Sequence, residues 1–173
     1  EETEADVVII NTCGFIESAK KEAIDNILDI AWLKKHKRLK GIIATGCLVE
    51  RYREEVMKEL PEVDGVFGIG ANGDIAELLT KMWNEGFTES FPEKENMPLC
   101  GDRELSTPSY FAYIKIAEGC DNRCSYCIIP YLRGKYRSRQ MDDVLYEARL
   151  LAAGGVKELL VVAQDTSRYG TDF

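Results

Sequence analysis

Three cysteines stand within eight residues in the second half of the chain, and their spacing is the strongest chemical signal in the sequence. They are Cys120, Cys124 and Cys127, in a C-x3-C-x2-C arrangement preceded by Gly119. Cysteine thiolates hold iron–sulfur clusters, and three thiolates on one loop leave one corner of a four-iron cluster without a protein ligand. An open corner can bind and activate a ligand, so the loop predicts a reactive cluster rather than one that only passes electrons.

A structural zinc site and a disulfide framework are the alternatives for this loop. Structural zinc takes four closed ligands, commonly as two pairs of Cys or His. The only histidine of the chain is the distant His36, and no fourth cysteine lies nearby. Three cysteines also cannot pair off among themselves as disulfides. The open-cornered cluster is therefore the favoured interpretation.

Length and composition are those of a globular chain with a buried core. Of the 173 residues, 45% are hydrophobic and 30% are charged, which is enough for one large or two small domains. The longest apolar runs have the length of a strand, and no signal peptide opens the chain, so we expect a cytoplasmic protein with no membrane partner. Six cysteines without secretory features fit a reducing compartment, where thiols serve metals or catalysis.

The formal net charge of −8 is carried by the first part of the chain. Residues 1–100 hold 12 basic and 20 acidic side chains, whereas residues 101–173 hold ten of each. An acidic surface repels phosphate backbones, so nucleic acid is not expected as a partner of this chain.

Alternating strand and helix signals over residues 1–86 predict a parallel sheet with helices on its faces. Short β-branched apolar runs indicate the strands, and apolar residues at helical spacing indicate the helices. We expect strands over 6–10, 41–45 and 63–68, and helices over 17–36, 50–60 and 74–84. The order is that of an α/β domain of the Rossmann or flavodoxin-like kind.

Two more cysteines each follow one of these strands, Cys13 after the first and Cys47 after the second. Parallel strands end at one edge of a sheet, where open α/β sheets bind ligands, so the two thiols are expected within roughly 5–8 Å of one another. The alternative is that each is a small buried residue at a strand end. Position alone leaves both interpretations open, and two thiols would be an incomplete cluster site.

The second half predicts a linker and then a different α/β arrangement. Residues 87–109 lack periodicity and predict a linker, within which Cys100 has no evident role. A strand over 111–117, a helix over 141–154 and a strand over 158–163 predict the beginning of a (β/α) barrel, whose working face is the carboxyl ends of its strands. The cysteine loop and Gln164-Asp165 both fall on that face. A barrel needs roughly 200–250 residues, so we expect a fragment.

A basic stretch follows the first cysteine of the loop. Residues 122–139 contain no acidic side chain and five basic ones, which are Arg123, Arg133, Lys135, Arg137 and Arg139. Such side chains could hold a cofactor carboxylate, balance the charge of a cluster or bind a partner. A solvated loop is an equally good interpretation for any one of them.

The cysteine motif, with Tyr126 before its last cysteine, resembles the radical S-adenosylmethionine enzymes. Longer stretches resemble the bacterial methylthiotransferases within that group, namely residues 11–16, 46–48, 117–120, 130–139 and 163–170. The residues after Asn11-Thr12-Cys13, and the aspartate after Gln164, resemble the branch that methylthiolates an aspartate of a small-subunit ribosomal protein. The transfer-RNA branches share the cysteine spacing and usually have asparagine in place of that aspartate.

This resemblance implies two 4Fe–4S clusters and S-adenosylmethionine as cofactors. Cys120, Cys124 and Cys127 would hold the radical cluster, whose open corner the cofactor fills. Cys13 and Cys47 would be two of three ligands of an auxiliary cluster, and no residue of this chain matches the first ligand. The implied partners are the ribosomal protein substrate and an electron donor.

The resemblance also implies a division of the chain and further site residues. Residues 1–86 would form the auxiliary-cluster domain and residues 110–173 the start of the radical domain, joined by the linker over 87–109. Tyr126 would border the adenine, and Gln164 and Asp165 would face cofactor or substrate. No catalytic side chain is predicted, because the cofactors carry the chemistry. The alternatives are a transfer-RNA adenosine methylthiotransferase and a non-catalytic zinc or iron–sulfur module.

Overall fold

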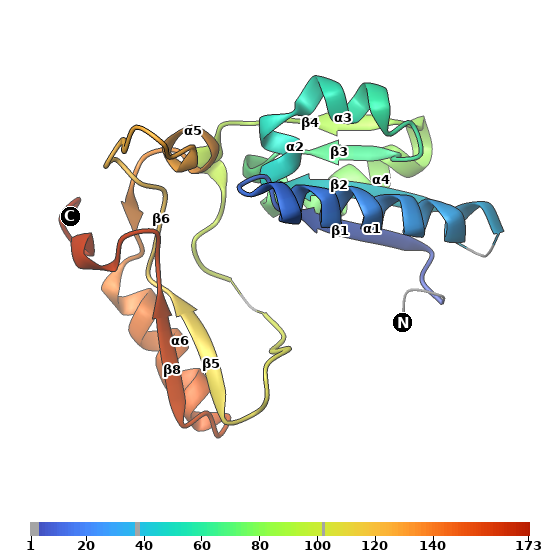
Figure 1. Ribbon diagram of the computed structural model, residues 1–173. Helices are drawn as coiled ribbons and strands as arrows, with labels where there is room; N and C mark the ends of the chain where they lie inside the picture. Colours follow the sequence, from blue (N-terminus) through green and yellow to red (C-terminus); the bar gives the residue numbers. More distant parts are fainter. Residues whose placement is uncertain (1–3, 37–38, 102) are drawn as a thin grey trace. The chain divides into compact units, whose positions relative to one another are not determined.

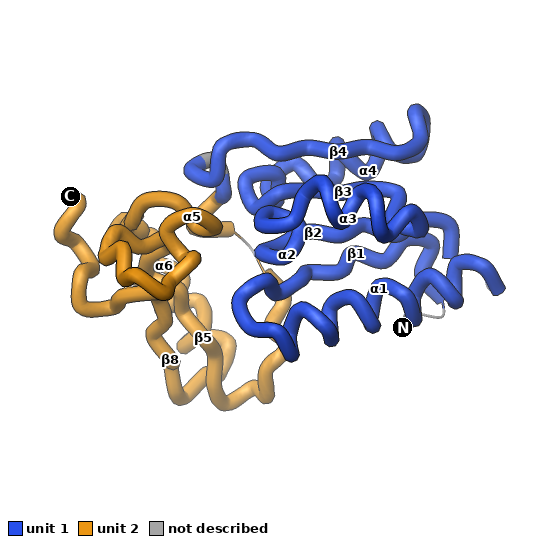
Figure 2. Tube along the Cα trace, turned by 45° about the horizontal axis from the view of Figure 1, so that its top comes forward, with its two compact units in different colours: residues 1–97 blue, residues 98–173 orange. Residues whose placement is uncertain are grey.

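The computed structural model describes residues 4–36, 39–101 and 103–173. The chain divides into two compact units, Glu1–Met97 and Pro98–Phe173 (Figure 2). Among the described residues, no helix combines the length and the apolar character that a membrane crossing requires.

The first unit is built on a four-stranded parallel sheet in the order β1-β2-β3-β4 (Figure 1). Its strands are β1 (Val7–Thr12), β2 (Gly41–Gly46), β3 (Gly65–Phe67) and β4 (Thr88–Ser90). Its helices are α1 (Glu17–His36), α2 (Cys47–Arg51), α3 (Arg53–Glu59) and α4 (Ile75–Glu85), with short 3-10 turns η1 (Ile69–Asp74) and η2 (Lys94–Asn96). The predicted parallel α/β sheet is confirmed.

Helices cover both faces of this sheet. On one face, α1 and the α2–α3 pair pack against the sheet through a cluster that includes Ile27, Ile42 and Val49. On the other face, Met82 of α4 packs with Ile43 and Phe67. Every residue of β2 is consequently buried, and strands covered on both faces form continuous apolar runs rather than alternating ones. Each fully buried aliphatic side chain of this kind contributes about 1.5–3 kcal/mol.

Two predictions for the first unit are corrected. The single helix predicted over 50–60 is a pair of short helices that begins at Cys47 and breaks at Tyr52, where φ is −123°. The linker predicted over 87–109 begins too early, because Thr88–Ser90 pairs with β3 as strand β4 and the compact unit continues to Met97. A three-residue edge strand of mostly polar residues carries no apolar pattern that distinguishes it from a loop.

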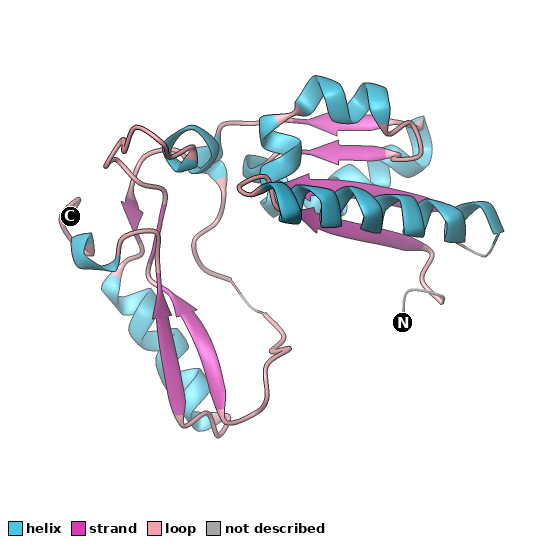
Figure 3. Cartoon of the chain, viewed as in Figure 1, coloured by secondary structure: helices cyan, strands magenta, loops and turns pink. Residues whose placement is uncertain are grey.

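The second unit contains two small sheets (Figure 3). Its elements are the parallel pair β5 (Phe111–Lys115) and β8 (Glu158–Val162), the antiparallel pair β6 (Ala117–Glu118) and β7 (Arg137–Ser138), helices α5 (Ile129–Arg133) and α6 (Met141–Ala153), and the 3-10 turn η3 (Thr166–Arg168). Leu151 of α6 packs with Ala112 and Val156, next to the larger sheet. The predicted strand–helix–strand order is confirmed.

The segment between β5 and α6 holds more structure than the sequence predicts. Strands β6 and β7 pair through Ala117 with Ser138 and Glu118 with Arg137, which closes the intervening residues into one large loop. Helix α5 lies within that loop. Two-residue strands and a five-residue helix are too short to leave a periodic pattern in the sequence.

Candidate metal centres

The cysteine loop follows the carboxyl end of β5, as the sequence predicts. Strands β5 and β8 are parallel and in register, with Lys115 opposite Val162, so both strands end at the same edge. Cys120 is buried, Cys127 is half-buried and Cys124 is exposed. The Cys127 amide donates a hydrogen bond of 2.9 Å to the Cys124 carbonyl, which forms a tight turn between the last two cysteines.

The donor set of this loop fits an iron–sulfur cluster by ligand type and number. All three side chains are thiols, and none is in a disulfide. Each thiolate of a cluster binds its own iron, so the sulfurs need not converge on one point. Within the described part of the chain, no three His, Cys, Asp or Glu side chains are grouped as ligands of a metal ion.

Gly119 sets the conformation at the entry to the loop. Its φ is +76°, and a Cβ at this position would overlap the carbonyl of Lys135. Within the loop, Arg123 has a φ of 49°, the one positive value among the described residues other than glycine. Backbone of this kind is rarely adopted by residues with a side chain, so the loop has a specific shape that the surrounding contacts must maintain.

A fully buried carboxylate stands beside the first cysteine. Glu118 is 0% exposed and forms ion pairs with Lys115 and, at 3.5 Å, with Arg133. Its Oε1 also accepts a hydrogen bond of 3.1 Å from the Gly119 amide. A buried carboxylate without such partners would cost several kcal/mol. Because Arg133 ends α5, this pairing ties that helix to the base of the cysteine loop.

The basic stretch is partly internal. Besides Arg133, Arg139 is buried, and its Nη1 donates to the Lys115 carbonyl at 2.8 Å and to Glu147 Oε2 at 2.5 Å. Its own carbonyl accepts a hydrogen bond of 3.0 Å from the Tyr169 hydroxyl. For these two arginines the structure therefore favours an internal role over a solvated one.

Gln164 and Asp165 follow β8 at the edge that carries the cysteine loop. In the described residues, Gln164 Oε1 is buried without a hydrogen-bond partner. A buried acceptor in this state is normally matched by a bound group or a water, so Gln164 fits the predicted contact with cofactor or substrate. That contact stays a prediction.

The carboxylate of Asp165 is engaged within the protein. Its Oδ1 accepts hydrogen bonds from the amide and hydroxyl of Ser167, at 3.1 and 2.6 Å, and its Oδ2 accepts one from Asn122 Nδ2 at 3.0 Å. These bonds from Ser167 and Asn122 lower the pKa of Asp165, so it is ionised at neutral pH. Its described contacts are thus with the cysteine loop and with its own turn.

Tyr126 lies between the last two cysteines and is 91% exposed. A ring exposed to this extent at the working edge is available to stack on a planar group. The predicted role beside the adenine is compatible with this position, and it stays a prediction.

Strands β1 and β2 bring Cys13 and Cys47 to one edge of the first sheet, as predicted. The strands are parallel, and Thr12 is paired with Gly46, so each cysteine directly follows a paired residue. Cys13 is half-buried, and Cys47 is buried as the first residue of α2. The shared edge is confirmed, and the shared metal site stays a prediction.

Two glycines allow the segments after β1 and β2 to approach each other. A Cβ at Gly14 would lie 2.6 Å from the carbonyl oxygen of Cys47. At Gly46, φ is +99°, and a Cβ would lie 2.5 Å from the carbonyl oxygen of Thr12. Arg51 Nη1 also donates a hydrogen bond of 2.9 Å to the Gly14 carbonyl. The backbone itself therefore fixes how the two cysteine segments pack.

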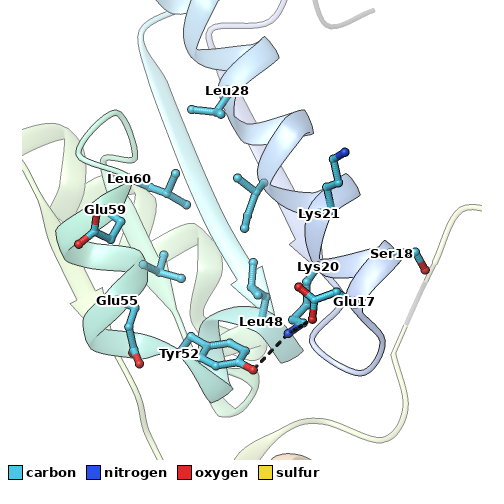
Figure 4. Close-up of a pocket in the computed structure, with 12 residues that line it drawn as sticks. Glu17, Ser18, Lys20, Lys21, Leu28, Leu48, Tyr52, Glu55, Glu59 and Leu60 are labelled. Carbon is cyan, nitrogen blue, oxygen red and sulfur yellow. Dashed lines mark hydrogen bonds and ion pairs between the residues drawn. The ribbon is translucent and has the colours of Figure 1, made fainter.

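A cleft of about 740 Å³ lies between α1 and the α2–α3 segment of the first unit (Figure 4). Its floor includes Leu28, Leu48 and Leu60, and at its rim Lys20 pairs with Glu17 and contacts the Tyr52 hydroxyl. None of the predicted metal or cofactor residues lines this cleft. The cavity therefore does not account for the predicted chemistry.

Both parts of the chain match known protein families. Residues 1–68 match the uncharacterized protein family UPF0004, and residues 114–173 match the radical SAM superfamily. The chain is 55% identical over 176 residues to the ribosomal protein uS12 methylthiotransferase RimO of Thermoanaerobacter sp. (strain X514), an alignment that covers 99% of this chain and 39% of that protein. Over 99% of its length the chain is thus similar to a curated methylthiotransferase, and its second half matches the radical SAM superfamily. These matches imply S-adenosylmethionine and iron–sulfur chemistry.

Other known proteins show the same similarity. The RimO protein of Clostridioides difficile (strain 630) is 53% identical over 174 residues, with 98% of this chain and 38% of that protein covered. The chain thus spans about two fifths of the length of the curated methylthiotransferases it matches. Among solved structures, the radical S-adenosylmethionine methyltransferase TsrM from Kitasatospora setae, with tryptophan substrate and the analogue aza-SAM bound, has a TM-score of 0.63 at 15% identity, covering 92% of this chain and 36% of that chain. This likeness shows the fold.

Sequence reasoning missed the polar residues that hold the cysteine loop in place. They are Glu118, Asp121, Asn122, Tyr136 and Arg168. Asp121 and Asn122 stand between two predicted ligands, and this position was the one available signal of a role. Their partners lie up to 43 positions away along the chain, so the pairing depends on the fold.

Proposed function

We propose that this chain carries the cluster-binding part of an enzyme that adds a methylthio group to the β-carbon of an aspartate in ribosomal protein uS12. The observation that carries the proposal is the three-cysteine loop at the shared carboxyl edge of β5 and β8. Its placement is the one that a (β/α) barrel uses for chemistry. The identity of 55% to a uS12 methylthiotransferase supports the choice of substrate.

In this proposal the two groups of cysteines serve two clusters of the 4Fe–4S kind. Cys120, Cys124 and Cys127 hold one and leave its fourth corner to S-adenosylmethionine. Cys13 and Cys47 supply two ligands of the other. When bound, these cofactors supply the one-electron chemistry that activates an unreactive carbon–hydrogen bond, which no side chain can do alone.

The chain's own residues bind and orient these groups. The buried acceptor of Gln164 offers a hydrogen-bonding site at the loop's edge, and the exposed ring of Tyr126 offers a stacking surface for the adenine. Glu118, held by two cations, fixes the base of the loop. The proposed division of labour places the auxiliary cluster in the first unit, Glu1–Met97, and the radical cluster in the second, Pro98–Phe173, with an electron donor as the second partner.

The test uses the full-length protein, reconstituted anaerobically with iron and sulfide and supplied with S-adenosylmethionine, a chemical reductant and purified uS12. We expect uS12 to gain the mass of one methylthio group, located on an aspartate by fragmentation. Transfer RNA supplied in place of uS12 should gain no methylthio group. The Cys124→Ala variant should modify neither uS12 nor transfer RNA. Modification of the transfer RNA, or bound zinc with no visible cluster absorbance, would overturn the proposal.

A further inference from the structure

Two of the three residues between Cys120 and Cys124 contact the segment that follows β8. The middle residue, Asn122, donates from Nδ2 to Asp165 Oδ2 at 3.0 Å across 43 positions of sequence. Arg123, next to it, takes the positive φ that turns the chain back toward Cys124. A spacer between two ligands would otherwise be free to sample many shapes.

The first spacer residue, Asp121, is held by the same segment. Its Oδ1 accepts the Tyr136 amide at 3.3 Å, and its Oδ2 lies 3.7 Å from Arg168 Nη2. The Arg168 guanidinium in turn lies over the Tyr136 ring, 5.1 Å from its centroid. The Tyr136 hydroxyl donates to the Asp165 carbonyl at 3.0 Å, which closes a connected network around the spacer.

Asp165 is itself oriented independently of the loop. The amide and hydroxyl of Ser167 both bind its Oδ1, which leaves Oδ2 directed to Asn122. Asp165 thereby caps η3 with one oxygen and holds the cysteine spacer with the other.

We propose that Asp165 and Asn122 are positioning residues that preorganise the cysteine loop for its cluster. The inference rests on the proposed function in one respect, namely that this loop holds a cluster. A loop whose shape is already fixed loses less conformational freedom on binding, and it therefore retains its ligand more tightly. The pair assigns Asp165 to the support of the cluster loop rather than to contact with substrate.

The test is an exchange of the two side chains. In the Asn122→Asp variant, two carboxylates face each other. The hydrogen bond between residues 122 and 165 is lost, and the two negative charges repel each other. In the double variant Asn122→Asp, Asp165→Asn, an amide again faces a carboxylate, with the donor and acceptor reversed and the net charge of the wild type restored. Asn122→Ala removes the bond without adding charge. Thr171→Ala is the matched control, because Thr171 is exposed in the same segment and is not one of the hydrogen-bond partners of Asn122 or Asp165.

The measurement is the anaerobic rate of iron release to a chelator from the reconstituted full-length protein. All variants carry Cys13→Ala and Cys47→Ala, so that the loop holds the only cluster measured. We expect about fivefold faster release for Asn122→Asp and Asn122→Ala, which is the effect of losing one hydrogen bond. The double variant should return to within about twofold of the reference, and so should Thr171→Ala. The electron paramagnetic resonance signal of the reduced cluster should change in the two single Asn122 variants. It should return to that of the reference in the double variant.

Two outcomes separate this inference from the proposed function. If the reference protein binds iron and all variants release it at the same rate, or the double variant is no better than Asn122→Asp, the positioning role is wrong. If the changes merely follow the thermal stability of the cluster-free variants, the pair is structural and the inference is also wrong. If the reference protein takes up no cluster at the loop, the proposed function itself fails.

Discussion

The two groups of cysteines are positioned by different kinds of interaction. Cys13 and Cys47 follow paired residues of adjacent parallel strands, so their placement comes from the register of the backbone. Cys120, Cys124 and Cys127 lie in a loop whose shape depends on side chains, chiefly the buried Glu118 and the Asn122–Asp165 contact. A sheet edge is a rigid scaffold, whereas a loop needs a supporting network of its own.

This difference predicts how each site responds to change. Side-chain substitutions around the first site should matter little unless they force the two strand ends apart. Around the second site, single side chains should matter individually, because each one holds a different point of the loop.

Removing a ligand should have opposite consequences for cofactor cleavage at the two sites. In the full-length protein, Cys124→Ala should abolish reductive cleavage of S-adenosylmethionine, because the three thiolates leave no spare ligand. Cys13→Ala should lower bound iron by about half and leave cleavage measurable, since the loop keeps all its thiolates. Chromatography of the products measures cofactor cleavage, and iron analysis of the purified variants measures cluster content. Cleavage at the wild-type rate by Cys124→Ala would remove that residue from the site.

Backbone packing should dominate the stability of the first site. Gly46→Ala should destabilise the first unit by about 3 kcal/mol or more, because strain at φ +99° adds to overlap with Thr12. Gly86→Ala is the matched control, since φ is +89° and a Cβ there meets nothing within 4 Å, so it should cost about 1–3 kcal/mol from strain alone. Denaturant unfolding followed by tryptophan fluorescence reports this unit, which holds both tryptophans. Equal losses in both variants would contradict the overlap argument.

A buried charge should dominate the stability of the second site. Glu118→Gln should destabilise the second unit by about 3 kcal/mol, because it leaves the Lys115 and Arg133 charges without their common partner. Glu158→Gln, at an exposed position of β8, should change stability by less than about 0.5 kcal/mol. Hydrogen exchange of peptides from residues 115–140 measures the loss of stability in both variants. The contrast between the sites fails if the two variants behave alike.

Mild acid should loosen the second unit through Asp172. Burial acts to raise the pKa of Asp172, but hydrogen bonds from the Ser138 hydroxyl and amide, at 2.5 and 2.8 Å, lower it overall. A lowered pKa contributes stability above the unfolded value of about 3.9, and this contribution is lost as pH falls through the folded pKa. The protection of the amides at residues 136–140, which is their exchange rate relative to the intrinsic rate at each pH, should fall between about pH 5 and 3 in the wild type. The Asp172→Asn variant should show a flatter pH dependence, and a dependence identical to the wild type would exclude this residue as the cause.

The elements that carry long periodic patterns were predictable from sequence. Helix α1 and strand β2 follow the predicted ranges closely, because apolar residues recur along α1 at helical spacing and β2 is a short continuous run rich in β-branched residues. The placement of Cys13 and Cys47 at one edge also follows, since alternating strands and helices make parallel strands. The break at Tyr52 and the edge strand β4 escaped prediction, because each depends on a few residues with no repeated pattern.

The sequence by itself determined the chemistry of this protein: the type, number and spacing of the thiols, and the strands after which they stand. The spacing of the three cysteines along the chain is enough to predict a shared cluster, because residues on one short loop cannot lie far apart. Only the tertiary structure decided which side chains support those thiols. Glu118 meets Arg133, and Asn122 meets Asp165, because strand pairing closes the loop and aligns β5 with β8. Such contacts join positions that are distant in sequence, and only folding brings them within hydrogen-bonding distance.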